Sequence, residues 1–340
     1  MRYPGGRFAM SVIHPGSPAL QIRYREGVLV NPFGFPEWAL CARAVIELPP
    51  PEPGLTRDEV RVVDVLTGNL AAAWVGDDPL WSGESTPAGW CWAHVGRTRL
   101  LALVPIELHG AYRHAGGITT LEVTGRGLRT GTSPVPVALT PPDPVPDDLL
   151  DLLERLLGWP LPEAYRRYLA ATNGAGPAAP GVLPGHGFVA DQPLFGLARA
   201  DRQQDISYVV EWARDRLTVD FLPIGYVQGG LLAVRVSGGD LDSIWYWDDD
   251  DPRARDEHDP EYICANLLHR CADTIDDFFA ALVRPADDLV RVATARVDNG
   301  QVRHVRDAEV GAGLPVRQRA PWQRPPPAVR DPLTTMFEVR

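Results

Sequence analysis

The spacing of apolar residues predicts short strands and helices along the first 130 residues. Strands are expected at 28–30, 42–48, 90–95 and 98–104. A helix is expected after Thr56, because Thr56 and Glu59 form a capping box and an apolar residue then recurs every three or four positions. A second helix should begin at Pro105 and stop at Gly116-Gly117, since proline favours the first helical position and glycine the position after a helix.

Beyond residue 146 the pattern changes to helices, then strands, then a final helix. Helices are expected at 147–157, 162–171 and 273–283, and strands at 221–225, 231–236 and 243–247. Helices set apart from a run of strands indicate an α+β fold. Asp298-Asn299-Gly300 is typical of a type I′ turn and predicts a hairpin within 289–310, after which the chain is expected to be extended.

Length and proline content predict two domains. The chain has 340 residues, enough for two hydrophobic cores, and 45% of them are hydrophobic, which excludes wholesale disorder. Its 34 prolines cluster at 49–53, 134–146 and 320–327. We therefore expect a first domain at 1–133, a semi-rigid Pro-rich linker at 134–146, a second domain at 147–285, and a hairpin with an extended tail at 286–340.

Charge divides the chain in the same way. Residues 1–133, the N-terminal half, hold 12 arginines and 12 acidic residues. Residues 147–285, the acidic half, hold 12 arginines against 24 acidic residues, a net charge of -12. The two halves are therefore expected to have different partners. Every one of the 33 cationic side chains is arginine, which favours two-pronged contacts with phosphate or carboxylate.

Segments that would direct the chain to a membrane are not evident. No apolar run approaches the roughly 18 residues needed to cross a bilayer, and the N-terminus lacks a charged-then-apolar pattern. The four cysteines show no CxxC spacing, which favours reduced thiols over a zinc site. We expect a cytoplasmic protein; the oligomeric state stays open.

Three histidines in the N-terminal half form a candidate hydrolytic site. His94 ends the strand 90–95, His109 lies in the following helix, and His114 comes five residues later. Phosphodiester hydrolysis requires a base that activates water and a cation that holds the developing charge, and histidine can serve both needs. His114 can share a metal with His109 only if the helix ends there, as Gly116-Gly117 predicts.

The surrounding residues resemble toxin nucleases of the HNH/endonuclease VII superfamily with a Trp-His-His signature. The matching positions are 34–38, Ala42, Asp64 and Asn69, 89–94, 103–105, His109 and 114–117. The resemblance implies a ββα-metal fold and a metal-dependent DNA endonuclease that uses Mg, Mn, Zn or Ni, with RNA as an open alternative. It implies that His94 is the general base and that His109 and His114 are metal ligands. Ala93 stands where the family has the first histidine of its pair, itself a metal ligand.

Ala93 has two interpretations. It marks either a degenerate nuclease or a substitution that disarms a toxic enzyme, and we favour the second, because a domain freed from selection should have lost more than one position. The alternative for all three histidines is an ordinary place in the core or on the surface.

The acidic half resembles the SMI1/KNR4 (SUKH) family over about 149–284. The resemblance rests on four segments in order: 161–169 with Asn173-Gly174, 221–225, 244–248 and 274–282. It implies an α+β domain with a mainly antiparallel sheet, in a family whose bacterial members commonly bind and neutralise nuclease toxins. The run of aspartates at 248–251 lacks the spacing of an EF-hand. A solvated loop is favoured for it, with an Arg-binding or DNA-mimicking patch as the alternative.

Together these features predict a metal-dependent DNA endonuclease fused to a SUKH regulatory or immunity-like domain, acting in toxin–immunity conflict or phage defence and inactivated at Ala93. The alternative is a non-catalytic binding protein with a degenerate nuclease domain. DNA is the expected partner, and the acidic half is a candidate intramolecular or protein-binding partner. It would compete with nucleic acid for arginines of the N-terminal half, for which the candidates are Arg97, Arg99, Arg113 and Arg126.

Overall fold

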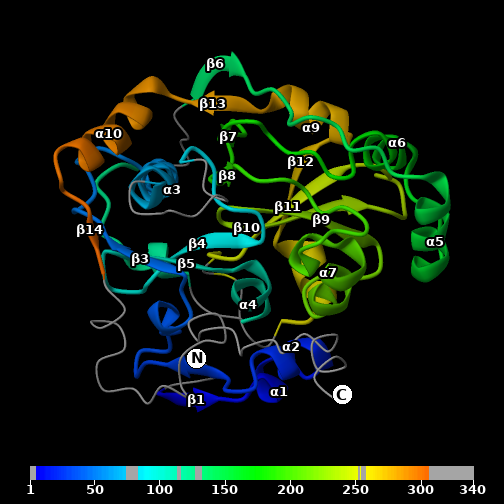
Figure 1. Cartoon of the computed structure of the whole chain (residues 1–340), viewed down its shortest axis with the longest axis horizontal. Coiled ribbons are helices and arrows are strands. Elements are labelled where there is room, and N and C mark those ends of the chain that lie inside the picture. Colours follow the sequence, from blue (N-terminus) through cyan, green and yellow to red (C-terminus); the bar gives the residue numbers. More distant parts are fainter. Residues whose placement is uncertain are drawn as a thin grey trace, which may run out of the picture.

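The computed structural model describes residues 5–73, 83–112, 116–126, 132–251, 253 and 258–305 (Figure 1). They form three four-stranded sheets and one two-stranded sheet, and the ladders between their named strands are antiparallel. Helices and antiparallel sheets together confirm the α+β class. Within the described residues no helix is long and apolar enough to cross a membrane.

The sheet that carries His94 has the strand order β14-β3-β5-β4. Its strands are β3 (Ala44–Glu47), β4 (Trp90–His94), β5 (Leu100–Pro105) and β14 (Arg303–His304). Helix α3 (Arg57–Ala73) begins at the expected capping box, where the Thr56 amide donates to Glu59 Oε2 at 2.9 Å and the Glu59 amide to Thr56 Oγ1 at 3.3 Å. Helix α4 (Ile106–Ala111) follows β5 directly. The local pattern therefore predicted the order of this unit, but α4 ends at Ala111 and not at the expected stop, Gly116-Gly117.

Shorter elements complete the N-terminal half. They are β1 (Gly6–Phe8), α1 (Met10–Ile13), α2 (Pro18–Arg23), β2 (Val28–Val30) and the 3-10 helices η1 (Trp38–Leu40) and η2 (Gly117–Thr120). The pair β1 and β2 forms the two-stranded sheet.

The acidic half contains the sheet β12-β11-β10-β9 with helices packed against it. The strands are β9 (Phe221–Val227), β10 (Gly230–Arg235), β11 (Ile244–Asp248) and β12 (Leu268–Ala272). The helices are α5 (Asp147–Leu157), α6 (Glu163–Thr172), α7 (Ile206–Ala213), α8 (Pro260–Asn266) and α9 (Ile275–Ala281), with the 3-10 helix η3 (Arg202–Gln204). These bounds confirm the expected helices and strands of this half.

The hairpin expected within 289–310 is wrong. Residues Asp287–Asp298 form helix α10, and Leu289 and Ala293, four apart, pack into one buried cluster with residues of α3 such as Val62. The Asn299-Gly300 pair ends this helix, with Gly300 at φ 63° and its amide bonded to the carbonyl of Val297. Such a pair suits a helix stop as well as a hairpin turn. The chain then adds β14 to the edge of the first sheet.

The Pro-rich segment is also partly ordered into a sheet. Strand β6 (Thr132–Pro136) pairs with β13 (Val283–Pro285), which pairs with β7 (Gly181–Val182), and β7 with β8 (Val189–Ala190). The start of the expected linker and the end of the acidic half are thus held together. In Figure 1, β6 and β13 run along one side of the molecule, next to α10.

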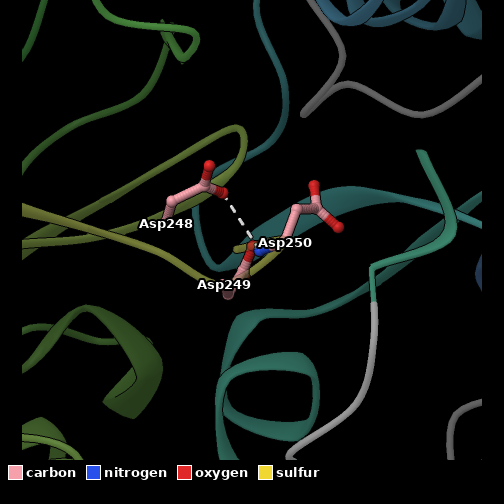
Figure 2. Close-up of side chains that lie close together, drawn as sticks. All are labelled: Asp248, Asp249 and Asp250. Atoms are coloured by element: carbon pink, nitrogen blue, oxygen red, sulfur yellow. Dashed lines mark hydrogen bonds between the residues drawn. The ribbon is translucent and has the colours of Figure 1, made fainter. Parts of the chain in front are cut away.

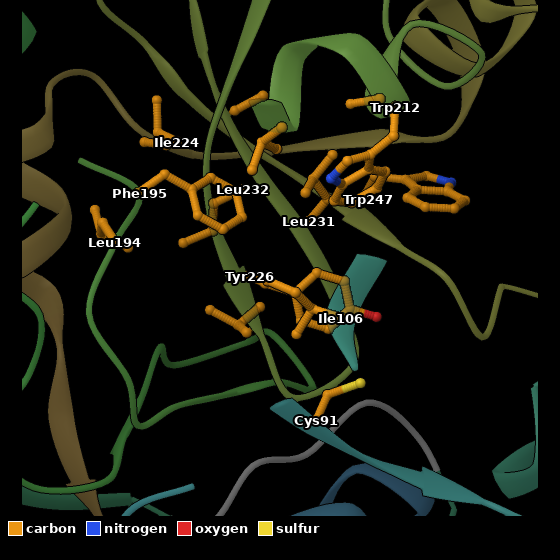
Figure 3. Close-up of a cluster of buried hydrophobic side chains, with 14 of the residues drawn as sticks. Cys91, Ile106, Leu194, Phe195, Trp212, Ile224, Tyr226, Leu231, Leu232 and Trp247 are labelled. Carbon is orange, nitrogen blue, oxygen red and sulfur yellow. The ribbon is translucent and has the colours of Figure 1, made fainter. Parts of the chain in front are cut away.

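The two halves share a continuous hydrophobic core. Cys91 and Ile106 of the N-terminal half belong to one buried cluster with Trp212, Tyr226 and apolar residues of β9 and β10, and Figure 3 shows both on the side of the Tyr226 ring. A Cβ added at Gly110 of α4 would lie 2.8 Å from the Trp212 ring, so this glycine allows the close approach. Arg216 donates to the carbonyls of Gly110 and Ala111, both at 2.9 Å.

Strand β4 is the edge of its sheet, and glutamines from the acidic half cover it. Gln228 accepts a hydrogen bond from the Trp92 amide at 2.9 Å, and Gln192 donates to the Trp90 carbonyl at 3.1 Å. An edge strand with unpaired backbone groups needs such partners once it is buried. The strand that ends in His94 is therefore held in place by both halves.

Candidate functional site

His94, Ala93 and His109 line one pocket. The sequence brings them there because β4, β5 and α4 follow one another with short connections. Eight of the other residues that line it are Arg61, Cys91, Gly117, Tyr226, Gln228, Gly229, Asp249 and Asp250. Residues of both halves thus surround the same space. His114 lies outside the described residues.

Ala93 and His94 point to opposite sides of β4. Side chains alternate along a strand, so Ala93 shares its side with Cys91 and His94 with Trp92. Cys91 and Ala93 belong to the core that extends into the acidic half, and Trp92 to the core around α3. A side chain at position 93 is therefore directed toward the acidic half, whereas His94 is directed toward α3.

His94 is held by a buried aspartate of α3. Its Nε2 lies 3.0 Å from Oδ2 of Asp64, whose side chain is fully buried. Arg99 donates to both oxygens of Asp64 at 2.9 Å, and Arg296 of α10 donates to Oδ1 at 2.8 Å. Burial alone would raise the pKa of Asp64, but the hydrogen bond from His94 and the charge of Arg99 outweigh it and hold this pKa well below its usual range.

His109 is held from the acidic half. Its Nδ1 lies 2.7 Å from the Tyr226 hydroxyl and 3.0 Å from Oδ2 of Asp249, and Tyr226 also donates to Asp249. Burial disfavours the charged form of His109, but the charge and the hydrogen bond of Asp249 outweigh it, so the pKa of His109 is raised. The Trp38 ring packs on the imidazole, with ring centroids 5.2 Å apart.

Asp249 belongs to the acidic turn, residues 248–251, which was expected to be a solvated loop. Instead the turn faces the N-terminal half, and Asp249 and Asp251 are 5% and 7% exposed. Figure 2 shows Asp248, Asp249 and Asp250 gathered at the end of β11; one carboxylate oxygen from each lies within 4.8 Å of the other two. The structure corrects the favoured interpretation and agrees with its alternative, an Arg-binding patch.

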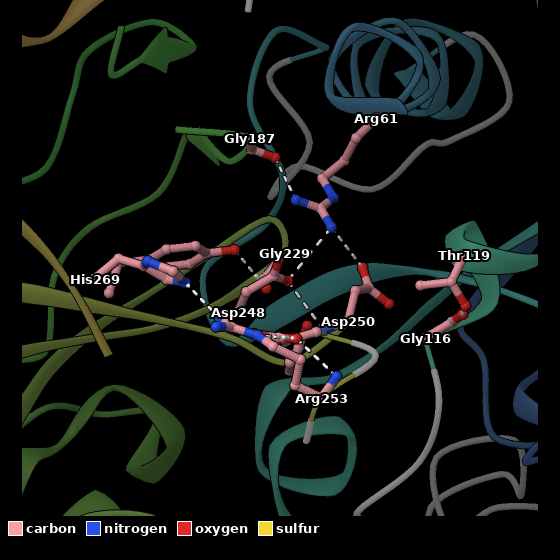
Figure 4. Close-up of polar contacts among 12 residues, drawn as sticks. Arg61, Gly116, Thr119, Gly187, Gly229, Asp248, Asp250, Arg253 and His269 are labelled. Carbon is pink, nitrogen blue, oxygen red and sulfur yellow. Dashed lines mark hydrogen bonds and ion pairs between the residues drawn. The ribbon is translucent and has the colours of Figure 1, made fainter. Parts of the chain in front are cut away.

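Arg61 of α3 binds two carboxylates of this turn. Its Nη2 lies 3.0 Å from Asp250 and 3.4 Å from Asp248, and its Nη1 donates to the Gly187 carbonyl (Figure 4). Because an arginine already occupies these carboxylates, the cluster does not by itself indicate a cation site. Burial and the neighbouring carboxylates raise the pKa of Asp248 to about 7 in spite of Arg61. Asp250 also closes over Gly116, where an added Cβ would lie 1.5 Å from its Oδ1.

The four arginines expected at a nucleic-acid surface have different surroundings. Arg99 is bound to Asp64. Arg97 is exposed and stacks on the Phe33 ring, 4.2 Å from its centroid, and Arg126 is exposed. Arg113 lies outside the described residues. The acidic turn is bound by Arg61 and, at Asp251, by Arg253, and the sequence alone singled out neither of them.

Two family models match the chain. Residues 82–124 match the model of "a nuclease of the HNH/ENDO VII superfamily with conserved WHH", and residues 144–281 match the SMI1/KNR4 family (SUKH-1). The chain therefore joins a segment similar to WHH nucleases to a segment similar to the SUKH family. No curated protein matches it significantly. Asp64, Arg61 and Arg296 lie outside both matched segments, so the pocket depends on more of the chain than the two models cover.

HNH/ENDO VII nucleases typically use divalent metal ions, and the chemistry of the pocket fits such an ion in part. Imidazole and carboxylate groups, the donors that Mn, Zn and Ni accept, line it as His109, Asp249 and Asp250. Ala93 stands where the conserved WHH of the matched family has its first histidine, and it supplies no donor for a metal.

Proposed function

We propose that the protein is a metal-dependent DNA endonuclease, disarmed at Ala93, whose SUKH segment restrains the site in cis in toxin–immunity conflict or phage defence. The observation that carries this proposal is the shared pocket of His94, His109 and position 93, in a segment that matches a nuclease family. His94 is assigned as the general base. His109, His114 and the histidine that Ala93 replaces are assigned as metal ligands.

The two sides of β4 support this division of roles. The side of position 93 is also the side of Tyr226 and Asp249, which hold His109, and the opposite side places His94 on Asp64. A bound divalent ion would stabilise negative charge on the phosphodiester. His94 would accept the proton of the attacking water, because its Nε2 is engaged by Asp64 and its other ring nitrogen is left for that task.

The acidic turn supports restraint in cis. Carboxylates on Arg61 and on His109 occupy groups that a phosphate would otherwise contact, and like charges repel a nucleic-acid backbone. The turn thus opposes the binding of nucleic acid.

We further propose that the domain boundaries at 1–133, 134–146 and 147–285 hold with one change, in which α10 and β14 join the nuclease domain. The packing of α10 on α3 and the pairing of β14 with β3 support this assignment. Removing everything after residue 146 would then also remove Arg296 and the edge strand. The restraint is therefore better tested by point substitutions.

The nuclease proposal is tested by plasmid cleavage. The protein, its Ala93→His variant and Ala93→His with His94→Ala are incubated with supercoiled plasmid and with RNA in Mg²⁺, Mn²⁺, Zn²⁺ or Ni²⁺. Ala93→His should raise the rate of DNA nicking by about 100-fold or more, because even outer partners of a metal site change activity by 10- to 100-fold. His94→Ala should abolish the restored activity.

Matched controls distinguish an effect at the pocket from a general effect of substituting a histidine. Ala272→His places a histidine on β12, outside the pocket, and should restore nothing. His186→Ala in the Ala93→His background should leave nicking unchanged, because His186 does not line the pocket. Robust cleavage by the protein as it stands would show that position 93 carries no ligand.

The alternative function is a non-catalytic binding protein. The filled pocket and Ala93 favour it, since a site occupied by its own acidic turn can persist without activity. In that case Ala93→His should stay inactive with all four metals while the SUKH segment still captures a protein partner. Restored nicking would exclude this alternative.

A further inference from the structure

Asp64 accepts an unusual number of charged hydrogen bonds for a fully buried carboxylate. His94 and Arg99 bind Oδ2, and Arg99 and Arg296 bind Oδ1, at distances of 2.8 to 3.0 Å. Two arginines and one aspartate in a buried place are stable only if the carboxylate is ionised and the geometry is good. Asp64 is therefore a permanent acceptor that has no proton to donate.

An acceptor at this place fixes the proton of the His94 ring. In a neutral imidazole one nitrogen carries the hydrogen and the other accepts. Because Asp64 can only accept, the hydrogen must lie on Nε2, which leaves the lone pair on Nδ1. Among the described residues Nδ1 of His94 makes no hydrogen bond, and the side chain lines the pocket. The basic nitrogen is thus available for a ligand in the pocket.

Arg296 comes from an element that neither family model covers. It is 1% exposed, and while Nη1 holds Asp64, its Nε donates to Glu52 at 2.9 Å. Helix α10 follows the whole SUKH segment and reaches this place because Leu289 and Ala293 pack into one buried cluster with apolar residues of α3. A buried arginine needs strong partners to repay its lost hydration, and here it has two.

We propose that Asp64 is the positioning residue of His94, fixing its Nε2-protonated tautomer so that Nδ1 serves as the base, and that Arg296 of α10 completes this arrangement. The tautomer follows from the contacts alone, whereas its use in hydrolysis rests on the proposed nuclease function. Asp64 and Arg296 contact no substrate and act only through His94.

The test measures the tautomer directly in the full-length protein. Two-dimensional ¹H–¹⁵N spectra of the histidine rings, assigned with His94→Gln, distinguish protonated from unprotonated ring nitrogens. We expect the Nε2-protonated form for His94, and loss of this preference in Asp64→Asn, whose neutral amide can either accept or donate. In Arg296→Gln, Asp64 remains but loses one of its two arginine partners, so it should orient His94 less strongly. The two tautomers of His94 should then both be populated.

Controls keep a merely structural role distinguishable. Glu52→Gln removes the other partner of Arg296 without touching Asp64, so the tautomer should stay as it is. Arg296→Lys should rescue the preference lost in Arg296→Gln. If Asp64→Asn fails to fold, the wild-type spectrum still decides the matter. An Nδ1-protonated His94, or an unchanged tautomer in a folded Asp64→Asn, would overturn the proposal.

Activity separates this inference from the nuclease proposal. In the Ala93→His background, Asp64→Asn should lower kcat by about 100-fold or more with little change in KM, the usual effect of losing a general base. If His94 has the expected tautomer but Ala93→His does not cleave DNA, the nuclease proposal is contradicted and the positioning role of Asp64 stands. Strong cleavage that is insensitive to Asp64→Asn would remove the positioning role and leave the nuclease.

Discussion

Two histidines of the pocket are each held by a buried aspartate, but the two aspartates differ in charge balance. Asp64, beside His94, is bound by two arginines and lies in the same half of the molecule as its histidine. Asp249, beside His109, comes from the acidic half and neighbours the carboxylates of Asp248 and Asp250, which share Arg61. The first arrangement is neutralised locally, and the second carries excess negative charge.

The difference separates a permanent part of the site from a removable one. A buried carboxylate that is paired with two arginines stays in place, because its removal would leave two buried positive charges without their partner. A turn with excess negative charge is held mainly by its contacts with Arg61 and His109. An anion that competes for Arg61, or a cation that binds the carboxylates, changes this balance of charge. We therefore expect disruption of the Asp64 network to affect folding, and disruption of the acidic turn to affect access to the pocket.

The largest effect is expected from Asp64→Ala. It leaves Arg99 and Arg296 buried without their shared partner, and such a loss costs about 3–5 kcal/mol of unfolding free energy. Urea denaturation followed by circular dichroism measures it. Asp298→Ala, at the exposed end of α10, is the matched control and should change stability by less than about 0.5 kcal/mol. Equal losses in the two variants would contradict the role given to the network.

A smaller effect, on activity, is expected at the acidic turn. In the Ala93→His background, Asp249→Asn and Asp250→Asn should each raise the rate of plasmid cleavage by about 5- to 10-fold, a coupling typical of regulatory contacts. The reason is that less negative charge then repels the phosphate backbone, and that Asp250→Asn also releases Arg61 to contact a phosphate. Asp276→Asn removes an exposed charge of the same half and should have no effect. Slower cleavage in Asp249→Asn would instead make this aspartate an orienting partner of a metal-bound His109.

The smallest effect is a difference in the pH dependence of stability. The lowered pKa of Asp64 means that its contribution is present above the ordinary value of about 3.9 and is lost as pH falls below it. The pH dependence of stability that Asp248 contributes has the opposite sign. Its pKa is raised to about 7, so the folded protein holds a proton that the unfolded chain releases, and stability declines as pH rises toward that value.

Substitution by asparagine separates the two contributions. Unfolding free energies measured between about pH 3 and 8 should show a flatter acid limb in Asp64→Asn and a flatter neutral limb in Asp248→Asn. Parallel curves for both variants and the unchanged protein would contradict the assigned pKa directions.

The sequence predicted local structure well where pattern and turn chemistry agree. The capping box before α3 and the order of β4, β5 and α4 follow from neighbouring residues, and so does the meeting of His94 and His109 in one pocket. The hairpin within 289–310 failed because Asn299-Gly300 suits two different endings. Only the packing of Leu289 and Ala293 on α3 distinguishes them, and a local pattern does not contain that contact.

The pattern of residues along the sequence did not predict contacts between segments that are far apart in the chain. Arg296 meets Asp64 across 232 positions of the sequence, and Arg61 meets Asp250 across 189. The aspartate run pointed to an Arg-binding patch as one alternative, but nothing local in the sequence says which arginine it meets. Asp64 itself was visible only as a position that the nuclease resemblance retained.

The central claim, that position 93 and His109 share one metal ion, is tested most directly by calorimetric titration with Zn²⁺ and Ni²⁺. Ala93→His should bind one equivalent at least about tenfold more tightly than the unchanged protein, and His109→Ala in that background should remove the gain. No nucleic acid is needed, so the result is independent of substrate. Equal affinity in the unchanged protein and in Ala93→His, or a gain that survives His109→Ala, would contradict the claim.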